Sequence, residues 1–176
     1  MTERQQRFRE ALETHWGIVA KVARTYCWHA DDREELVQEI CTQLWLAFPR
    51  YDESRVFSSW MYRIALNVAI SWVRQHSARR RRLVAFDEAV HEPSVQLTAP
   101  DEDGRLAFLQ RFIATLDPLH RGLVLLYLDE KTHAEIADIL GISVSNVGTK
   151  IGRIKKRLRD ASVAEKQRGR PWNSMT

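Results

Sequence analysis

Residues 131–159 read KTHAEIADILGISVSNVGTKIGRIKKRLR and contain a pair of short helices with their caps. Thr132 and Glu135 have the spacing of a capping box, in which a hydroxyl and a carboxylate satisfy free N–H groups at a helix start. Gly141 follows the apolar residues of the first helix and can take the left-handed conformation that ends it. Ser143 is a ready N-cap for the second helix. The spacing predicts two helices joined by a tight turn.

The second helix of this pair has an apolar face and a polar, basic face. Its apolar residues recur at spacings of three and four, and they are Val144, Val147, Ile151, Ile154 and Leu158. The candidate DNA-contacting residues of the other face are Ser145, Asn146, Thr149, Lys150, Arg153, Lys156 and Arg157. One helix fits the major groove, where its early side chains reach base edges and its cations neutralise phosphates. The pattern favours a DNA-binding helix-turn-helix over a helical hairpin with a solvated basic face.

Helical periodicity also dominates the N-terminal half. Residues 4–27 predict one amphipathic helix, and residues 32–47 predict a second. Residues 49–56 break the period and predict a loop. A third helix is expected to begin at Ser58 as its N-cap and to run into the arginines after residue 73.

The segment 83–104 separates two helical parts of the chain. It contains two prolines, six acidic residues and neither lysine nor arginine, while basic blocks flank it on both sides. This layout is typical of two polyanion-binding modules joined by a solvated linker, although a pair of charged helix faces would give the same pattern. Helical pattern resumes at Arg105, pauses at Asp117–Pro118 and ends near Asp160.

The sequence therefore predicts an all-α protein with two small helical domains joined by a flexible acidic linker, the C-terminal domain being a helix-turn-helix. The predicted boundaries are 1–82 for the first domain, 83–104 for the linker, 105–162 for the second domain and 163–176 for a frayed tail.

Several function classes lack support in the sequence. Cys27 and Cys41 show neither a CxxC spacing nor a paired-histidine pattern, so no metal or cofactor is expected; both lie on apolar helical stripes and are predicted core residues. The sequence has neither a nucleophile–base pattern nor a glycine-rich phosphate loop, so it does not indicate an enzyme. No signal peptide is evident, and no apolar stretch is long enough to span a bilayer, so a cytoplasmic protein is expected.

Two stretches resemble the extracytoplasmic-function (ECF) group of sigma factors in the sigma-70 family. The first lies within residues 32–74 and reads EELVQEICTQLW, then FSSWMYRIALNVAISWVR; the second is residues 116–159. Together they cover about half of the chain in the family's order, and the WxYRIAxNxA string is specific in that setting. The resemblance implies an alternative sigma factor that binds RNA polymerase core and directs transcription initiation at particular promoters.

The same resemblance implies partners and roles for individual residues. The residues that match the surface for the beta-prime clamp of core polymerase are Glu35, Gln38, Glu39 and Gln43. Tyr51 and Asn67 would capture a flipped base of the −10 element. The residues placed along the DNA phosphates there are Arg74, Arg79 and Arg80. The second domain would bind the −35 element through the helix after Ser143, and the beta flap of the polymerase is a further expected partner.

Three points remain open in the sequence. Gly148 and Gly152 stand where many relatives carry larger side chains; they weaken the helix and permit close approach of its backbone to DNA. An anti-sigma factor between the two domains is a hypothesis prompted by the two-domain plan. The alternatives are a stand-alone helix-turn-helix regulator, which would bind duplex DNA without polymerase, and a pure interaction protein, which the basic face after Ser143 disfavours.

Overall fold

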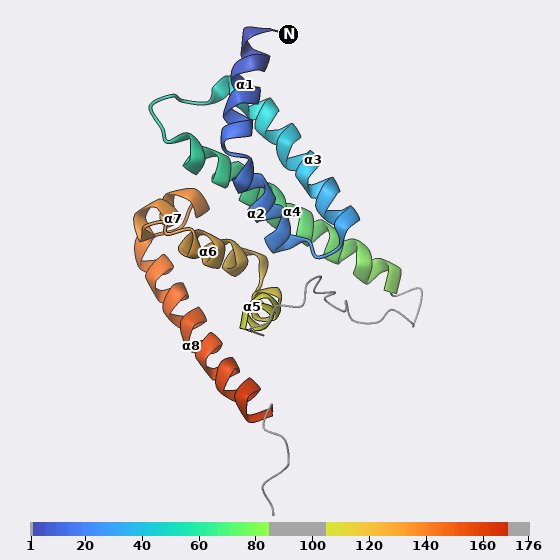
Figure 1. Ribbon diagram of the computed structural model, residues 1–176, viewed down its shortest axis with the longest axis vertical. Coiled ribbons are helices and arrows are strands. Elements are labelled where there is room, and N and C mark those ends of the chain that lie inside the picture. Colours follow the sequence, from blue (N-terminus) through green and yellow to red (C-terminus); the bar gives the residue numbers. More distant parts are fainter. Residues whose placement is uncertain (1, 85–104, 169–176) are drawn as a thin grey trace, which may run out of the picture.

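The computed structural model describes residues 2–84 and 105–168, and for residues 77–84, 105 and 166–168 it describes the backbone alone. These ranges contain helices and no strand, which confirms the all-α prediction (Figure 1). The elements are α1 (Glu3–Thr14), α2 (Trp16–Tyr26), α3 (Ala30–Ala47), the 3-10 helix η1 (Phe48–Arg50), α4 (Phe57–Val84), α5 (Arg105–Ala114), α6 (Pro118–Leu128), α7 (His133–Leu140) and α8 (Val144–Arg168). Residues 85–104 of the predicted linker lie outside the described residues, and its first two residues, 83 and 84, form the end of α4. None of the described helices combines the length and apolar character needed to cross a bilayer.

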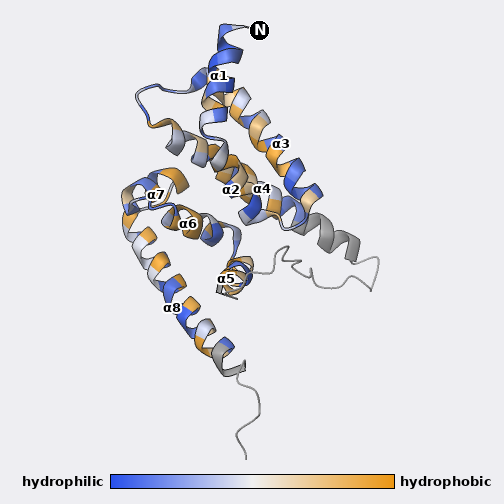
Figure 2. Cartoon of the chain, viewed as in Figure 1, coloured by the Kyte–Doolittle hydropathy of each residue, from blue (hydrophilic) through white to orange (hydrophobic). Residues whose placement is uncertain are grey.

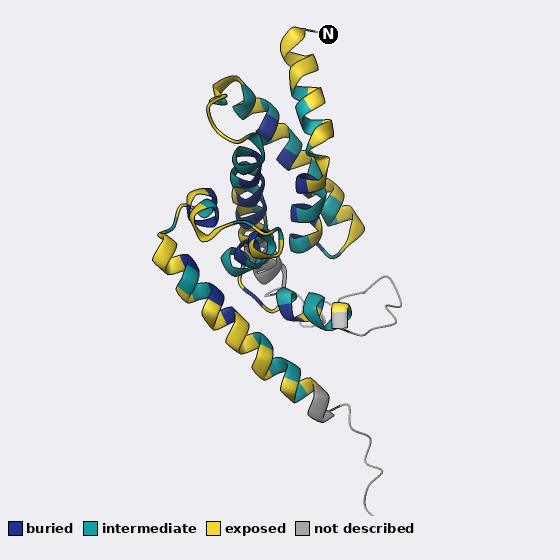
Figure 3. Cartoon of the chain, turned by 60° about the vertical axis from the view of Figure 1, so that its left-hand side comes forward, coloured by how far each residue is buried: buried dark blue, intermediate teal, exposed yellow. Residues whose placement is uncertain are grey.

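The prediction of one continuous helix over residues 4–27 was wrong. The chain breaks at His15, whose backbone has φ −111° and ψ 16° and whose N–H bonds to carbonyls of the last turn of α1. Helix α1 has no buried residue and α2 has five, so the break separates an outer helix from a core helix (Figure 3).

Two predicted helix ends were also displaced. Helix α4 begins at Phe57, because the N–H groups of Ser59 and Trp60 already bond to the carbonyl of Val56, so Ser58 is not its N-cap. Helix α8 continues to Arg168, eight residues past the predicted end. Its extra turns are held to α5 by Arg111, whose guanidinium lies 2.9 Å from Glu165 Oε1.

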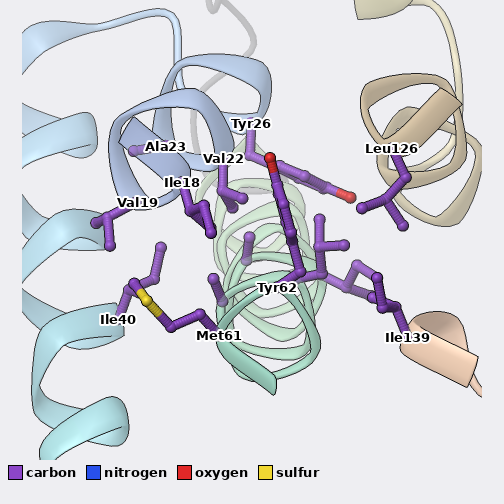
Figure 4. Packing of buried hydrophobic residues seen from close by; sticks show 14 of the residues in the cluster. Ile18, Val19, Val22, Ala23, Tyr26, Ile40, Met61, Tyr62, Leu126 and Ile139 are labelled. Carbon is purple, nitrogen blue, oxygen red and sulfur yellow. The ribbon is translucent and has the colours of Figure 1, made fainter. Parts of the chain in front are cut away.

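One hydrophobic core runs through both halves of the chain. The apolar stripes of the helices turn toward one another (Figure 2), and the buried cluster joins α2, α3 and α4 to α6, α7 and α8. Figure 4 shows Tyr26 and Tyr62 on one side of this contact and Leu126 and Ile139 on the other. All four side chains are at most 3% exposed. The two helical units therefore form a closed arrangement, a contact that the sequence did not predict.

Polar contacts surround this shared core. Asp129, just after α6, accepts a hydrogen bond from Tyr62 Oη at 2.6 Å and pairs with Lys21 on α2. Tyr26 Oη donates to the carbonyl of Pro118 at 2.6 Å. Each of these contacts joins the N-terminal unit to the C-terminal unit, so together they fix how the two units pack.

Acidification is expected to weaken the contact at Asp129. Burial acts to raise the pKa of this carboxyl, but hydrogen bonds from Lys21 and Tyr62 outweigh it and hold the pKa below its ordinary value. Because the folded-state pKa is depressed, the stabilisation is present above the unfolded pKa of about 3.9 and is lost as pH falls through the folded value. Between pH 7 and pH 3 the thermal unfolding temperature should fall less in Asp129→Asn than in the wild type. An equal fall in both proteins would contradict a stabilising role for the Asp129 carboxylate.

Candidate nucleic-acid interface

The helix-turn-helix forms as its cap residues predict. The hydroxyl of Thr132 accepts from the N–H of Glu135 at 3.2 Å, and the carboxylate of Glu135 accepts from the N–H of Thr132 at 2.8 Å. Gly141 ends α7 with φ 66°, in the left-handed region. Ser143 Oγ accepts from the N–H of Asn146 at 3.2 Å and caps α8. These local bonds fix the angle at which α8 leaves α7.

Helix α8 presents its polar stripe to solvent while its apolar stripe holds it to the protein. Val147, Ile151 and Ile154 are at most 6% exposed. The predicted DNA-contacting residues are all exposed except Lys150, which is half-buried, and they are Ser145, Asn146, Thr149, Lys150, Arg153, Lys156 and Arg157. No acidic residue occurs from residue 144 to 159. The stripe is therefore an accessible cationic surface of the kind that binds DNA phosphates.

Replacing Gly152 by alanine is expected to stabilise the protein by about 1 kcal/mol, since glycine inside a helix costs that much relative to alanine. Gly152 is exposed, and a Cβ built there would meet nothing within 4 Å. The midpoint of chemical denaturation should rise with an unchanged slope. If affinity for promoter DNA falls in the same variant, the backbone at Gly152 approaches the DNA closely. A lower midpoint would contradict the open surroundings.

A second polar surface lies between α3 and α4. A groove of about 670 Å³ is lined by all four predicted polymerase-binding residues together with Asn67. Glu35, Gln38 and Glu39 are exposed, and Gln43 donates from Nε2 to Glu39 Oε1 at 2.9 Å. Its side chains are carboxylates and amides, which suits a partner with cationic and hydrogen-bonding groups.

Trp72 also lines this groove. Its indole N–H is buried and has no acceptor among the described residues. The ring stacks on His76 with centroids 3.6 Å apart. The buried indole N–H is therefore an unpartnered donor beside a groove lined by carboxylates and amides.

The structure separates the two residues that were predicted to capture a flipped base. Asn67 lines the α3–α4 groove, whereas Tyr51 lines a different pocket, between α1 and the segment that joins α3 to α4. Tyr51 Oη donates to the carbonyl of Arg55 at 2.5 Å, and its ring packs against Phe57 and Trp60 with centroids 5.1 and 5.0 Å apart. The two side chains thus lie in different pockets.

The predicted phosphate-contacting arginines follow Asn67 along α4. Arg74 is exposed. Arg79 and Arg80 lie on the last turns of α4, where the backbone alone is described. The helix therefore carries its cationic segment at the end away from Tyr51.

The cysteines are core residues, as predicted. Cys27 is 3% exposed, and Cys41 is half-buried. Burial raises the pKa of the Cys27 thiol to about 12 and also raises that of Cys41. Both thiols are protonated at neutral pH and are poor nucleophiles.

Residues of α1 line the Tyr51 pocket, and the sequence reasoning missed them. Arg7, Glu10, Ala11 and Thr14 recur at spacings of three and four, so they share one face of the helix. That polar spacing was visible in the sequence, but without the break at His15 nothing indicated what the face covers.

The comparisons with known proteins agree with this architecture. The family model described as Sigma-70 region 2 matches residues 12–79, and the model described as Sigma-70, region 4 matches residues 109–158. The RNA polymerase sigma factor CnrH of Cupriavidus metallidurans is 30% identical over 168 residues, which cover 88% of this chain and 85% of CnrH. The ECF RNA polymerase sigma factor SigW of Bacillus subtilis is 25% identical and covers 89% of this chain and 91% of SigW.

A solved structure shares the fold. The sigma factor RpoE of Bartonella quintana, in its co-crystal structure with the anti-sigma factor NepR, superposes with a TM-score of 0.72 at 20% identity. The match covers 89% of this chain and 96% of RpoE. Because the two family models match in order and relatives match over most of the chain, this protein belongs to the ECF group of the sigma-70 family and is an alternative sigma factor that directs transcription initiation.

Proposed function

We propose that this sigma factor binds polymerase core and the −10 element through residues 1–82 and the −35 element through residues 105–162. Residues 83–104 would connect the two units, and residues 163–176 would form a tail whose first turns extend α8. The chain would act in the cytoplasm as a binding protein without chemistry of its own.

The observation that carries the proposal is the placement of two different polar surfaces on the two units. The α3–α4 groove holds Glu35 and Glu39, and a carboxylate-rich surface suits a basic protein partner such as the beta-prime clamp. The outer stripe of α8 is cationic and suits DNA. One unit is therefore fitted to the polymerase and the other to the duplex.

An apolar groove on the C-terminal unit supports a second polymerase contact. Helices α5, α6 and α8 line it with residues that include Phe112, Tyr127 and Leu128. Leu128 is 56% exposed, so the apolar lining of this groove is accessible to a partner. We assign this groove to the beta flap. An anti-sigma factor is a further proposed partner, since RpoE and CnrH have each been solved in complex with a regulatory protein, NepR and the cytosolic domain of CnrY.

Run-off transcription tests the function. Purified core polymerase and genomic promoter fragments are combined, with this protein added or omitted, and transcripts that require it are expected. Tight duplex binding by the protein alone, with no dependent transcripts and no binding to core, would instead indicate a stand-alone regulator.

The polymerase-binding surface needs a matched pair of variants. Glu39→Lys reverses a charge inside the groove, whereas Glu34→Lys reverses one on the same helix outside it. Native gel shift of core polymerase should show weaker binding for Glu39→Lys alone. Equal binding by both variants would remove the groove from the proposal.

A further inference from the structure

The groove between α5 and the second half of α8 is lined by aromatic rings and by charges of both signs. Phe108 and Phe112 of α5 are its aromatic residues, and α8 contributes Arg157, Asp160 and Glu165. Its volume of about 390 Å³ lies in the range of about 300–1,000 Å³ in which proteins bind drug-sized ligands. The groove therefore has room for one large side chain of a partner.

This groove is separate from the apolar groove assigned above to the beta flap. The apolar groove includes residues of α6 and has no acidic residue in its lining. The α5–α8 groove includes no residue of α6 and two acidic residues, and Phe112 alone lines both grooves. A different kind of side chain is therefore expected to fill the α5–α8 groove.

The lining suits an aromatic ring with a cation close to it in sequence. Aromatic rings pack favourably on one another, and guanidinium groups stack on an indole. Arg111 and Arg157 line the groove and are both exposed, so their guanidinium groups are accessible to such a ring. Asp160 is exposed, and Glu165 is 48% exposed although it lies 2.9 Å from Arg111. The two carboxylates can therefore accept a further cation.

The chain supplies an aromatic ring and a cation directly after α8. Residues 169–176 read GRPWNSMT and lie outside the described residues. Trp172 is their one aromatic residue, and Arg170 is their one charged residue. Glycine is common just after the end of a helix, where it lets the chain reverse, and proline soon after it cannot continue the helix. Gly169 and Pro171 stand at these two positions after Arg168, the last residue of α8.

The length of this segment matches the distance to the groove. At about 1.5 Å per residue, Asp160 lies about 12 Å back along α8 from Arg168. An extended chain of about four residues spans about 13 Å, so Trp172 can lie level with Asp160. Ile154, in the middle of the apolar groove, lies about 21 Å back, which is beyond this reach. The segment can therefore fill the α5–α8 groove and not the groove assigned to the beta flap.

We propose that residues 169–176 turn back along α8 and that Trp172 docks in the α5–α8 groove against Phe108 and Phe112, with Arg170 beside the groove's carboxylates. The docked segment holds α5 to the last turns of α8, in addition to the ion pair of Arg111 with Glu165. Arg157 belongs both to this groove and to the polar stripe of α8. The docked segment therefore lies at the edge of the proposed DNA-binding surface.

Fluorine NMR of the full chain labelled with fluorotryptophan tests the docking. The signal that is missing from Trp172→Phe belongs to Trp172, and it should differ in chemical shift from the same residue in a free peptide of residues 169–176. Phe108→Ala should move the signal to the position of the free peptide, because the aromatic wall is lost. Leu106→Ala is the matched control: Leu106 is on the same helix and 52% exposed, but it lines neither groove, so the signal should stay in place.

Hydrogen exchange measures what the docked segment does to α5. In Trp172→Ala the amides of α5 should exchange about tenfold faster than in the wild type, which corresponds to a loss of about 1.4 kcal/mol of local stability, while those of α2 should not change. A Trp172 signal at the position of the free peptide in the wild type would overturn the inference, and so would equal shifts in Phe108→Ala and Leu106→Ala. A signal that moves to the free position on dilution of the protein would place Trp172 on a second copy of the chain and would also overturn it.

Discussion

Replacing Gly122 by valine is expected to separate the two helical units. Gly122 lies on α6 where the units meet, and a Cβ built there would lie 2.9 Å from Tyr26 Oη and 3.3 Å from Leu66 Cδ2. Tyr26 cannot move away freely, because its hydroxyl is bonded to the carbonyl of Pro118. A valine side chain would add two more carbons to a contact that is already too short. Overpacking of this kind costs about 1–3 kcal/mol, and here it falls on the contact between units.

Small-angle X-ray scattering should show a larger radius of gyration for Gly122→Val, and thermal unfolding should split from one transition into two because the units no longer share a core. Gly17→Val is the control: Gly17 is exposed on α2, and a Cβ there would meet nothing within 4 Å. Unchanged scattering and a single transition in Gly122→Val would show that the contact tolerates the added carbons.

Separation of the two helical units matters for function because the two promoter elements are far apart. Elements near −10 and −35 are separated by about 85 Å of duplex at about 3.4 Å per base pair. In the closed arrangement α7 contacts α4, so the polar face of α8, which is proposed to bind the −35 element, begins beside the N-terminal unit. The closed chain cannot contact both elements at once. Gly122→Val is therefore expected to bind core at a lower concentration than the wild type. The variant no longer has to break the contact between its two units before it binds.

The helix-turn-helix could be predicted because its boundaries are set by neighbouring residues. Thr132 with Glu135, Gly141 and Ser143 each act within four positions of the chain, and each does in the structure what its spacing indicated. The end of α8 could not be predicted in this way. Its last turns contact α5 through Arg111, which lies 54 positions from its partner Glu165.

The packing of the two units could not be predicted from the sequence for a related reason. Tyr26 and Leu126 have the same apolar pattern as any core residue, and nothing local marks them as partners across a contact between units. The resemblance to the family supplied Asn67 and Glu39 as separate candidates. Only the packing of α4 on α3 places them on one groove and leaves Tyr51 on another.

Arg153→Ala is expected to lower transcription from promoters that keep their −35 element by about tenfold to a hundredfold, since one arginine contact to a base edge contributes about 1–3 kcal/mol. Arg153 is exposed near the middle of the polar stripe of α8, one turn after Thr149 and Lys150. Its removal leaves the apolar side of the helix unchanged, so the protein should unfold at the wild-type temperature and bind core with the wild-type affinity.

Arg159→Ala provides the comparison that decides whether the stripe reads DNA or only attracts it. Arg159 is also exposed and carries the same charge, but six residues at 100° each turn it about 120° away from Arg153. Holoenzyme binding to promoter fragments with intact or scrambled −35 elements separates the two effects. Arg153→Ala should lose most of the preference for the intact element, whereas Arg159→Ala should weaken binding to both fragments slightly and equally. Equal losses in the two variants would mean that α8 contributes charge alone and that −35 recognition lies on another face.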